Sequence, residues 1–165
     1  MSEKSLFQNR VRKKLSQKSY LRNASIILSA KIAEVYSWDS YIDDPKNIEE
    51  LHNMRISIKR LRYSMEFFSV NYDRKFDQFL QVWVDLQKLL GEIHDCDVGQ
   101  DVLTDYVKDQ SQESSADTLG INALIERYHE TRDGKYREFL KRWSSLQKEN
   151  FRRNLLRMIK RKRGE

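Results

Sequence analysis

The chain of 165 residues combines 39% apolar with 34% charged residues and contains only five Gly and one Pro, which predicts one all-α domain rather than a β architecture. The net charge of +6 and the sequence pI of about 9.4 favour a polyanionic partner without identifying it. A single cysteine, Cys96, excludes an intramolecular disulfide, and no long apolar run or signal-peptide pattern occurs, so we expect a cytoplasmic protein.

Residues 4–37 form the first expected helix, because apolar side chains recur along them at helical spacing. Arg10, Lys14 and Lys18 repeat every four residues and would form a cationic row on this helix. The row is explained either by solubility or by a role as a second wall of an anion-binding groove. Arg10 and Lys14 are the better candidates for the groove.

The second expected helix spans residues 45–70. Asp44 before Pro45 is a good helix start, with Pro at the first helical position. Asn47 and Glu50 offer an overlapping capping-box alternative. In either case the helix begins well before its row of cations.

That row is the most informative feature of the sequence. At about 100° per residue it occupies an arc of about 80° and runs about 15 Å along the helix axis. We call it the cationic stripe, and it consists of His52, Arg55, Lys59 and Arg62. Because like charges at these spacings repel, the stripe needs a counter-charge from elsewhere, although Glu66 at its end is expected to pair with Arg62.

Apolar residues flank the stripe on both sides, and a polar sector completes the helix. The first band comprises Leu51, Met54, Ile58, Leu61, Met65 and Phe68, and the second comprises Ile56, Tyr63 and Phe67. The polar sector, which is the expected solvent face, comprises Asn53, Ser57, Arg60 and Ser64. A solvated basic face is the simpler explanation of the stripe, but two apolar flanks favour a groove between helices.

A third helix is expected at residues 74–108 and a fourth at residues 119–162, with a polar linker at residues 109–118. Gln87, Gly91 and His94 lie on one line of the third helix. Gly91 costs up to about 1 kcal/mol against Ala, so we expect it to allow close approach of a backbone or a ligand. Gly134 is a candidate bend in the fourth helix. A basic cluster near the C-terminus suits a helix end electrostatically, or it extends the anion-binding surface; it comprises Arg152, Arg153, Arg157, Lys160, Arg161, Lys162 and Arg163.

Two motifs in this order resemble a known family. His52-x-x-Arg55-x-x-x-Lys59-Arg-Leu-Arg-Tyr, followed by the Leu-Gly segment from Leu86 to Val98, is similar to the CHAD family, the conserved-histidine α-helical domain. The resemblance implies an antiparallel bundle of four long helices that binds inorganic polyphosphate without catalysis or a cofactor. It also implies that the stripe contacts the phosphates, and it suggests polyphosphate granules as a location. His94 follows the Leu-Gly segment, where the family has a polar or basic residue, so it is either a weak ligand contact or a packing histidine.

Full-length members of this family resemble two four-helix halves around one central groove. This chain has one stripe helix and one Leu-Gly segment, so it resembles a single half. We therefore expect a homodimer with two-fold symmetry that brings two stripes together.

Two other functions remain as alternatives. A nucleic-acid-binding bundle fits the charge, but the stripe lacks base-reading side chains and its aromatics lie at core spacing. A metal-dependent phosphohydrolase of the HD type would use His52, His94, Asp95 and a later Asp. The cations around His52 would repel a divalent metal, so we expect neither a metal site nor an enzyme.

Overall fold

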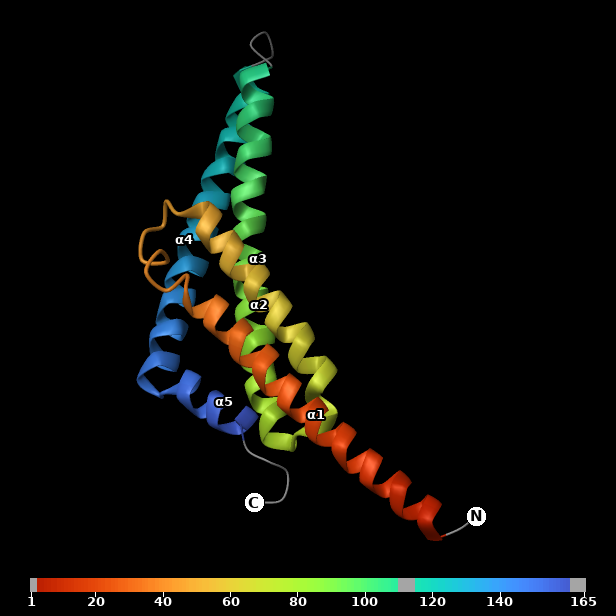
Figure 1. Ribbon diagram of the computed structural model, residues 1–165. Coiled ribbons are helices and arrows are strands. Elements are labelled where there is room, and N and C mark those ends of the chain that lie inside the picture. The colour runs from red at the N-terminus through yellow and green to blue at the C-terminus, as the bar shows by residue number, and fades with distance from the viewer. Residues whose placement is uncertain (1–2, 110–114, 161–165) are drawn as a thin grey trace.

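The computed structural model describes residues 3–109 and 115–160, and the side chains of residues 20–109 and 118–160 (Figure 1). All regular structure in these ranges is helical, which confirms the all-α fold. The helices are α1 (Glu3–Tyr36), α2 (Ile48–Phe68), α3 (Arg74–Asp109), α4 (Ser115–Lys148) and α5 (Phe151–Lys160), and the 3₁₀ turn η1 (Ser69–Asn71) follows α2.

The helices form a bundle in which α1 and α2 lie across the hairpin made by α3 and α4 (Figure 1). Helix α3 contacts both α2 and α4, and α1 contacts α2 and α5. The far ends of α3 and α4 extend beyond the start of α2, whereas α5 turns back at the opposite end of the hairpin (Figure 1). Helix α2 therefore contacts its neighbours in the middle of the bundle.

The first apolar band of α2 forms part of the core. All six of its residues are buried: Leu51, Met54, Ile58, Leu61, Met65 and Phe68. They recur at spacings of three and four, so they cover one side of the helix. The second band does not pack in this way, since Tyr63 is 48% exposed and Phe67 is 66% exposed. The cationic stripe thus has a core on one flank and an exposed aromatic strip on the other.

The expected polar sector of α2 is partly covered by α1. Ser57 is only 3% exposed, where solvent was expected. Its hydroxyl accepts a hydrogen bond from Trp38 Nε1 (3.1 Å) and donates one to Glu34 Oε1 (3.1 Å). Arg60 remains exposed and also reaches Glu34 (3.3 Å). A small hydroxyl side chain that finds two partners can be buried without loss of hydrogen bonding.

Helix α2 begins later than the Asp44-Pro45 pattern predicted. It starts at Ile48, with Asn47 as the capping residue. The Asp44 carboxylate accepts from the backbone N–H of Lys46 (2.9 Å), which closes a turn outside the helix. The Asn47 amide donates to the carbonyl of Tyr41 (2.8 Å) and makes no cap bond. Both polar side chains therefore shape the α1–α2 connection, which displaces the helix start.

The expected fourth helix is also wrong as a continuous element. Helix α4 already begins at Ser115, inside the expected linker, and it runs without a break past Gly134 to Lys148. Asn150 then adopts φ 55°, a left-handed conformation that Asn tolerates better than most residues. The chain turns there, and α5 packs its Phe151, Leu155 and Ile159 into the core. The basic residues 161–163 lie outside the described part of the chain.

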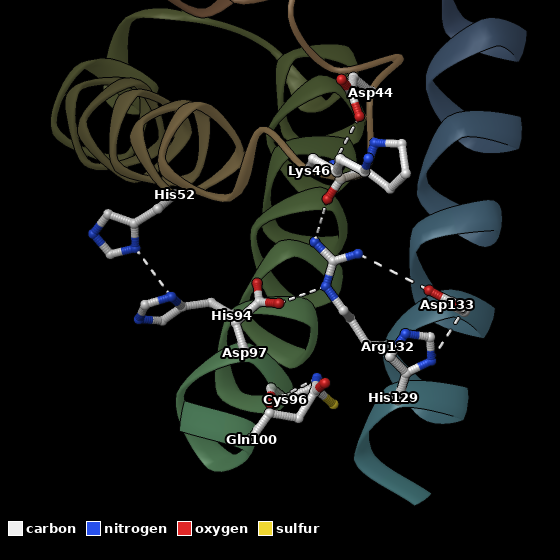
Figure 2. Close-up of polar contacts among 11 residues, drawn as sticks. Asp44, Lys46, His52, His94, Cys96, Asp97, Gln100, His129, Arg132 and Asp133 are labelled. Atoms are coloured by element: carbon white, nitrogen blue, oxygen red, sulfur yellow. Dashed lines mark hydrogen bonds and ion pairs between the residues drawn. The ribbon is translucent and has the colours of Figure 1, made fainter. Parts of the chain in front are cut away.

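Helix α4 holds the α1–α2 connection in place through side chains on one face. Tyr136 donates to the carbonyl of Ile42 (2.6 Å), and Trp143 Nε1 donates to the Asp39 carboxylate (2.6 Å). Nearer the start of the same helix, the guanidinium of Arg132 donates to the Asp97 carboxylate on α3 and to the carbonyl of Pro45 (2.7 Å). Figure 2 shows Arg132 reaching between these two acceptors. Sequence reasoning missed Arg132, although its spacing of four residues from Tyr136 placed it on the inward face.

Asp97 and Arg132 form a buried ion pair, being 7% and 6% exposed. We expect Asp97→Ala to lower the free energy of unfolding by about 3 kcal/mol or more, because it leaves a buried guanidinium without its counter-charge. Asp101→Ala is the matched control, since Asp101 is exposed one turn farther along α3. Urea denaturation of both variants measures the difference, and equal midpoints would show that the ion pair contributes little.

Candidate anion-binding site

The cationic stripe lies along the edge where α2 meets α3. His52, Arg55 and Arg62 are half-buried there, whereas Lys59 is exposed. Arg62 and Arg55 lie closest to the buried band of α2 and Lys59 lies farther round the helix. His52 lies farther still, and it is half-buried because His94 of α3 packs against it. The stripe is therefore an open edge and not a channel enclosed on both sides.

His52 at the start of the stripe meets His94 of α3. Their Nδ1 atoms are 3.2 Å apart and their ring centroids 4.3 Å apart. Figure 2 shows the two rings pointing toward each other from the two helices. A hydrogen bond between two Nδ1 atoms needs one ring to donate and the other to accept, so at least one ring is neutral at that atom. His94 thus joins the stripe through His52, in agreement with its position after the Leu-Gly segment.

The surroundings of His52 oppose its protonation. Burial lowers the pKa of His52 below its ordinary value of 6.5, and the charges of His94 and Arg55 lower it further, against a smaller opposite effect of Glu49. The ring is therefore mostly neutral at pH 7 in the free protein. An anion placed beside it would act in the opposite direction and favour the charged ring.

Gly91 of α3 lies beside the Arg55 side chain. A methyl group added at Gly91 would be 3.5 Å from Arg55 Nε and 3.9 Å from Arg55 Nη2. Both are ordinary van der Waals distances, so an alanine would fit here, and the expected close approach of a backbone or a ligand at this glycine is not seen. Arg55 Nε is buried and has no hydrogen-bond partner among the described residues. An unpaired buried donor costs about 1–3 kcal/mol, which suggests a role other than stability.

Arg62 lies at the other end of the stripe, beside Glu66. Arg62 Nε is 3.2 Å from Glu66 Oε1, so the expected ion pair is confirmed. The N–H does not point at the carboxylate, however, and Nε makes no hydrogen bond within the described part of the chain. The guanidinium also lies 4.6 Å from the centroid of the Tyr63 ring. Arg62 is thus held in place, and its Nε donor still makes no hydrogen bond to the described residues.

The acidic residues near the edge where α2 meets α3 leave most of the positive charge of the stripe without a partner. Glu66 pairs with Arg62, and Glu92 of α3 pairs with Lys135 of α4 (2.7 Å). Within residues 20–109 and 118–160, neither Arg55 nor Lys59 has an acidic partner within ion-pair distance. The Gln87 side-chain oxygen on α3 is likewise buried without a partner among these residues. The arrangement suits a ligand that brings negative charge to the α2 edge.

The other predicted cations cannot be placed at the site. Arg10 and Lys14 belong to α1, but their side chains lie outside the described residues. Their proposed place in a second wall of the groove therefore stays a prediction.

Of the residues of the alternative metal site, only His52 and His94 come together. No group of three His, Cys, Asp or Glu side chains in the described ranges could hold a metal ion. Asp97 is bound to Arg132, and Asp95 is exposed. Cys96 is buried, and burial together with Asp97 and Asp95 raises the pKa of its thiol, which disfavours a reactive thiolate. Separately, the helices in the described ranges include none with the length and apolar character needed to cross a membrane.

Comparison with known proteins supports one family. Neither a curated protein nor a solved structure matches the chain. The family model of the CHAD domain matches residues 3–104, more than half of the chain, and these residues include the cationic stripe and the Leu-Gly segment. The chain therefore belongs to the CHAD domain family.

Proposed function

We propose that this protein binds inorganic polyphosphate along the cationic stripe and that it does so without catalysis. CHAD domains in general bind polyphosphate. The observation that carries the proposal is the state of the two arginines, whose buried Nε atoms lack hydrogen-bond partners within the described residues. A buried polar group without a partner calls for an explanation, and a bound ion beside the guanidinium is one of them.

Each residue of the stripe has a distinct role in this proposal. Arg55 and Arg62 offer planar, bidentate donors to phosphate oxygens, whereas Lys59 acts as an exposed point charge. His52 donates through a ring nitrogen and gains a proton when phosphate lies beside it. Because the cations follow one another along about 15 Å of helix, a linear polyanion can contact all of them at once. A single phosphate ion would contact only one or two.

The absence of catalysis is part of the proposal. The stripe offers donors and charges but no nucleophile beside a base, and the buried thiol of Cys96 disfavours nucleophilic attack. We place the binding in the cytoplasm, where Cys96 would stay reduced and where polyphosphate granules would be its target.

One observation favours nucleic acid as a second candidate ligand. Tyr63 and Phe67 were expected at core spacing, but both rings are exposed beside the stripe, and Lys59 and Arg62 pack against Tyr63. Exposed aromatics next to cations can stack unpaired bases, which contributes about 1–3 kcal/mol per base. Competition between polyphosphate and single-stranded DNA or RNA at fixed salt distinguishes the two ligands, and Tyr63→Leu should weaken only nucleic-acid binding.

The stripe makes a directional prediction for mutants. Lys59→Glu should weaken polyphosphate binding about tenfold or more, because it reverses a charge that faces the ligand. Arg60→Glu is the matched control, since Arg60 is also exposed but points about 100° away from Lys59. Titration calorimetry at fixed ionic strength measures both affinities. If both variants lose the same affinity, the attraction is due to diffuse net charge, and the assignment of the stripe as the binding site is wrong.

The neutral His52 makes binding depend on pH. The pKa of His52 is lowered in the free protein, and bound phosphate should raise it, so binding takes up a proton between these two values. Affinity should therefore increase as pH falls from about 8 to about 6, and level off below the pKa of the free protein. His52→Gln should flatten this dependence. If the two profiles coincide, His52 has a structural role only.

The exposed aromatic strip supports the proposed homodimer. Tyr63 and Phe67 leave apolar surface beside the stripe, and a second copy placed there would cover it while bringing two stripes together. Sedimentation equilibrium without ligand should give twice the monomer mass of 19.9 kDa, and Phe67→Glu should return the protein to the monomer. A persistent monomer at tens of micromolar wild-type protein would reject the dimer and leave an open stripe on a single chain.

A further inference from the structure

A cavity of about 560 Å³ lies at the corner where the ends of α1 and α4 meet α5. Its volume is in the range of small-molecule sites. Apolar side chains form part of its wall, and they are Leu146, Phe151 and Leu156. The cavity shares no residue with the cationic stripe, and of its lining residues only Tyr36 and Asp39 fall within the segment that matches the CHAD family.

One side of the cavity is strongly basic. Arg153, Arg157 and Lys160 line it at spacings of four and three residues, so they stack along one face of α5. The opposite face of α5 is buried in the core, which directs these cations outward. Asp39 is the acidic residue of the lining, and its Oδ1 atom already accepts hydrogen bonds from Trp143 and Gln147, both at 2.6 Å. Within the described residues no carboxylate forms an ion pair with Arg153, Arg157 or Lys160, so these cations remain available to an anion.

On the inner side of the cavity, the Tyr36 ring lies between Trp143 and the guanidinium of Arg152. The Tyr36 ring packs against Trp143, with centroids 4.9 Å apart, and the guanidinium of Arg152 lies 4.8 Å above the Tyr36 ring. The Tyr36 hydroxyl is buried and makes no hydrogen bond to any described residue. Burial raises its pKa to about 12, so the hydroxyl stays a donor at neutral pH. A planar group would therefore stack on the exposed guanidinium of Arg152 and not on the Tyr36 ring itself.

We propose that this cavity binds a nucleoside phosphate. The phosphate chain would lie on the row of Arg153, Arg157 and Lys160, which present bidentate and point charges in sequence. The base would lie against the apolar wall and the flat guanidinium of Arg152. Gln147 and Asn150 also line the cavity; the Gln147 amide already donates to Asp39, so the Asn150 amide is the one that would pair with a base edge. An inorganic anion would use the cations alone and leave the apolar wall unfilled.

Titration calorimetry of the full chain with ADP and with pyrophosphate, at one ionic strength, tests the proposal. Both probes carry two linked phosphates, and only ADP carries a base and a ribose. We expect ADP to bind about tenfold tighter or more, because only it can bury an apolar group in the cavity. Equal affinities would overturn the proposal and leave a basic patch, and so would the absence of ADP binding at millimolar concentration.

Variants then locate the ADP. The double change Arg153→Glu with Arg157→Glu should weaken ADP binding at least tenfold. Arg127→Glu with Arg137→Glu is the matched control, because it changes net charge equally at exposed positions of α4 outside the cavity. Lys59→Glu should leave ADP binding intact while it weakens polyphosphate binding. Equal losses in the two double variants, or loss of ADP binding in Lys59→Glu, would overturn the proposal; circular dichroism verifies that each variant is folded.

Discussion

The position of the candidate site depends on one buried guanidinium. Arg132 of α4 binds Asp97 of α3 and the carbonyl of Pro45 in the α1–α2 connection, so it joins three segments that are distant in sequence. Because α2 begins three residues after Pro45, this contact anchors the chain just before the helix that carries His52. A buried charge held by two acceptors tolerates little movement, since any displacement leaves it unpaired. The contact thereby holds the start of α2 beside α3 and α4.

The edge where α2 meets α3 combines features that do not favour stability. Like charges follow one another along α2, two arginine Nε atoms are buried without hydrogen bonds to described residues, and a glycine interrupts the packing surface of α3. Each of these is unfavourable in the free protein. The apolar core on the other side of α2 compensates for them, with large side chains that are fully buried. A bound polyanion would satisfy the donors and reduce the repulsion together, which explains why these features occur side by side.

The turn at Asn150 gives the bundle a second basic surface. If α4 had continued through this residue, the cations of α5 would have projected from the end of a straight helix. The left-handed conformation of Asn150 instead returns the chain onto α1 and α3, so that the buried face of α5 closes the core and its basic face borders a cavity. The same turn brings Arg152 onto the ring of Tyr36, a residue far away in sequence. The backbone conformation of Asn150 thus decides whether the basic residues extend along a straight helix or border a cavity.

The sequence by itself predicted the features that depend on neighbours within a helix. These are the all-α fold, the alignment of an apolar band from Leu51 to Phe68, the alignment of the stripe and the pairing of Arg62 with Glu66, because each follows from a helical period of 3.6 residues. Only the tertiary structure decided that Ser57 is covered, that Phe67 is exposed and that Arg132 is bound to Asp97. These outcomes depend on which helices meet, and the partners are separated by tens of residues. Periodicity identifies the two apolar bands of α2, but only the packing of α1 and α3 against that helix decides which band becomes the core.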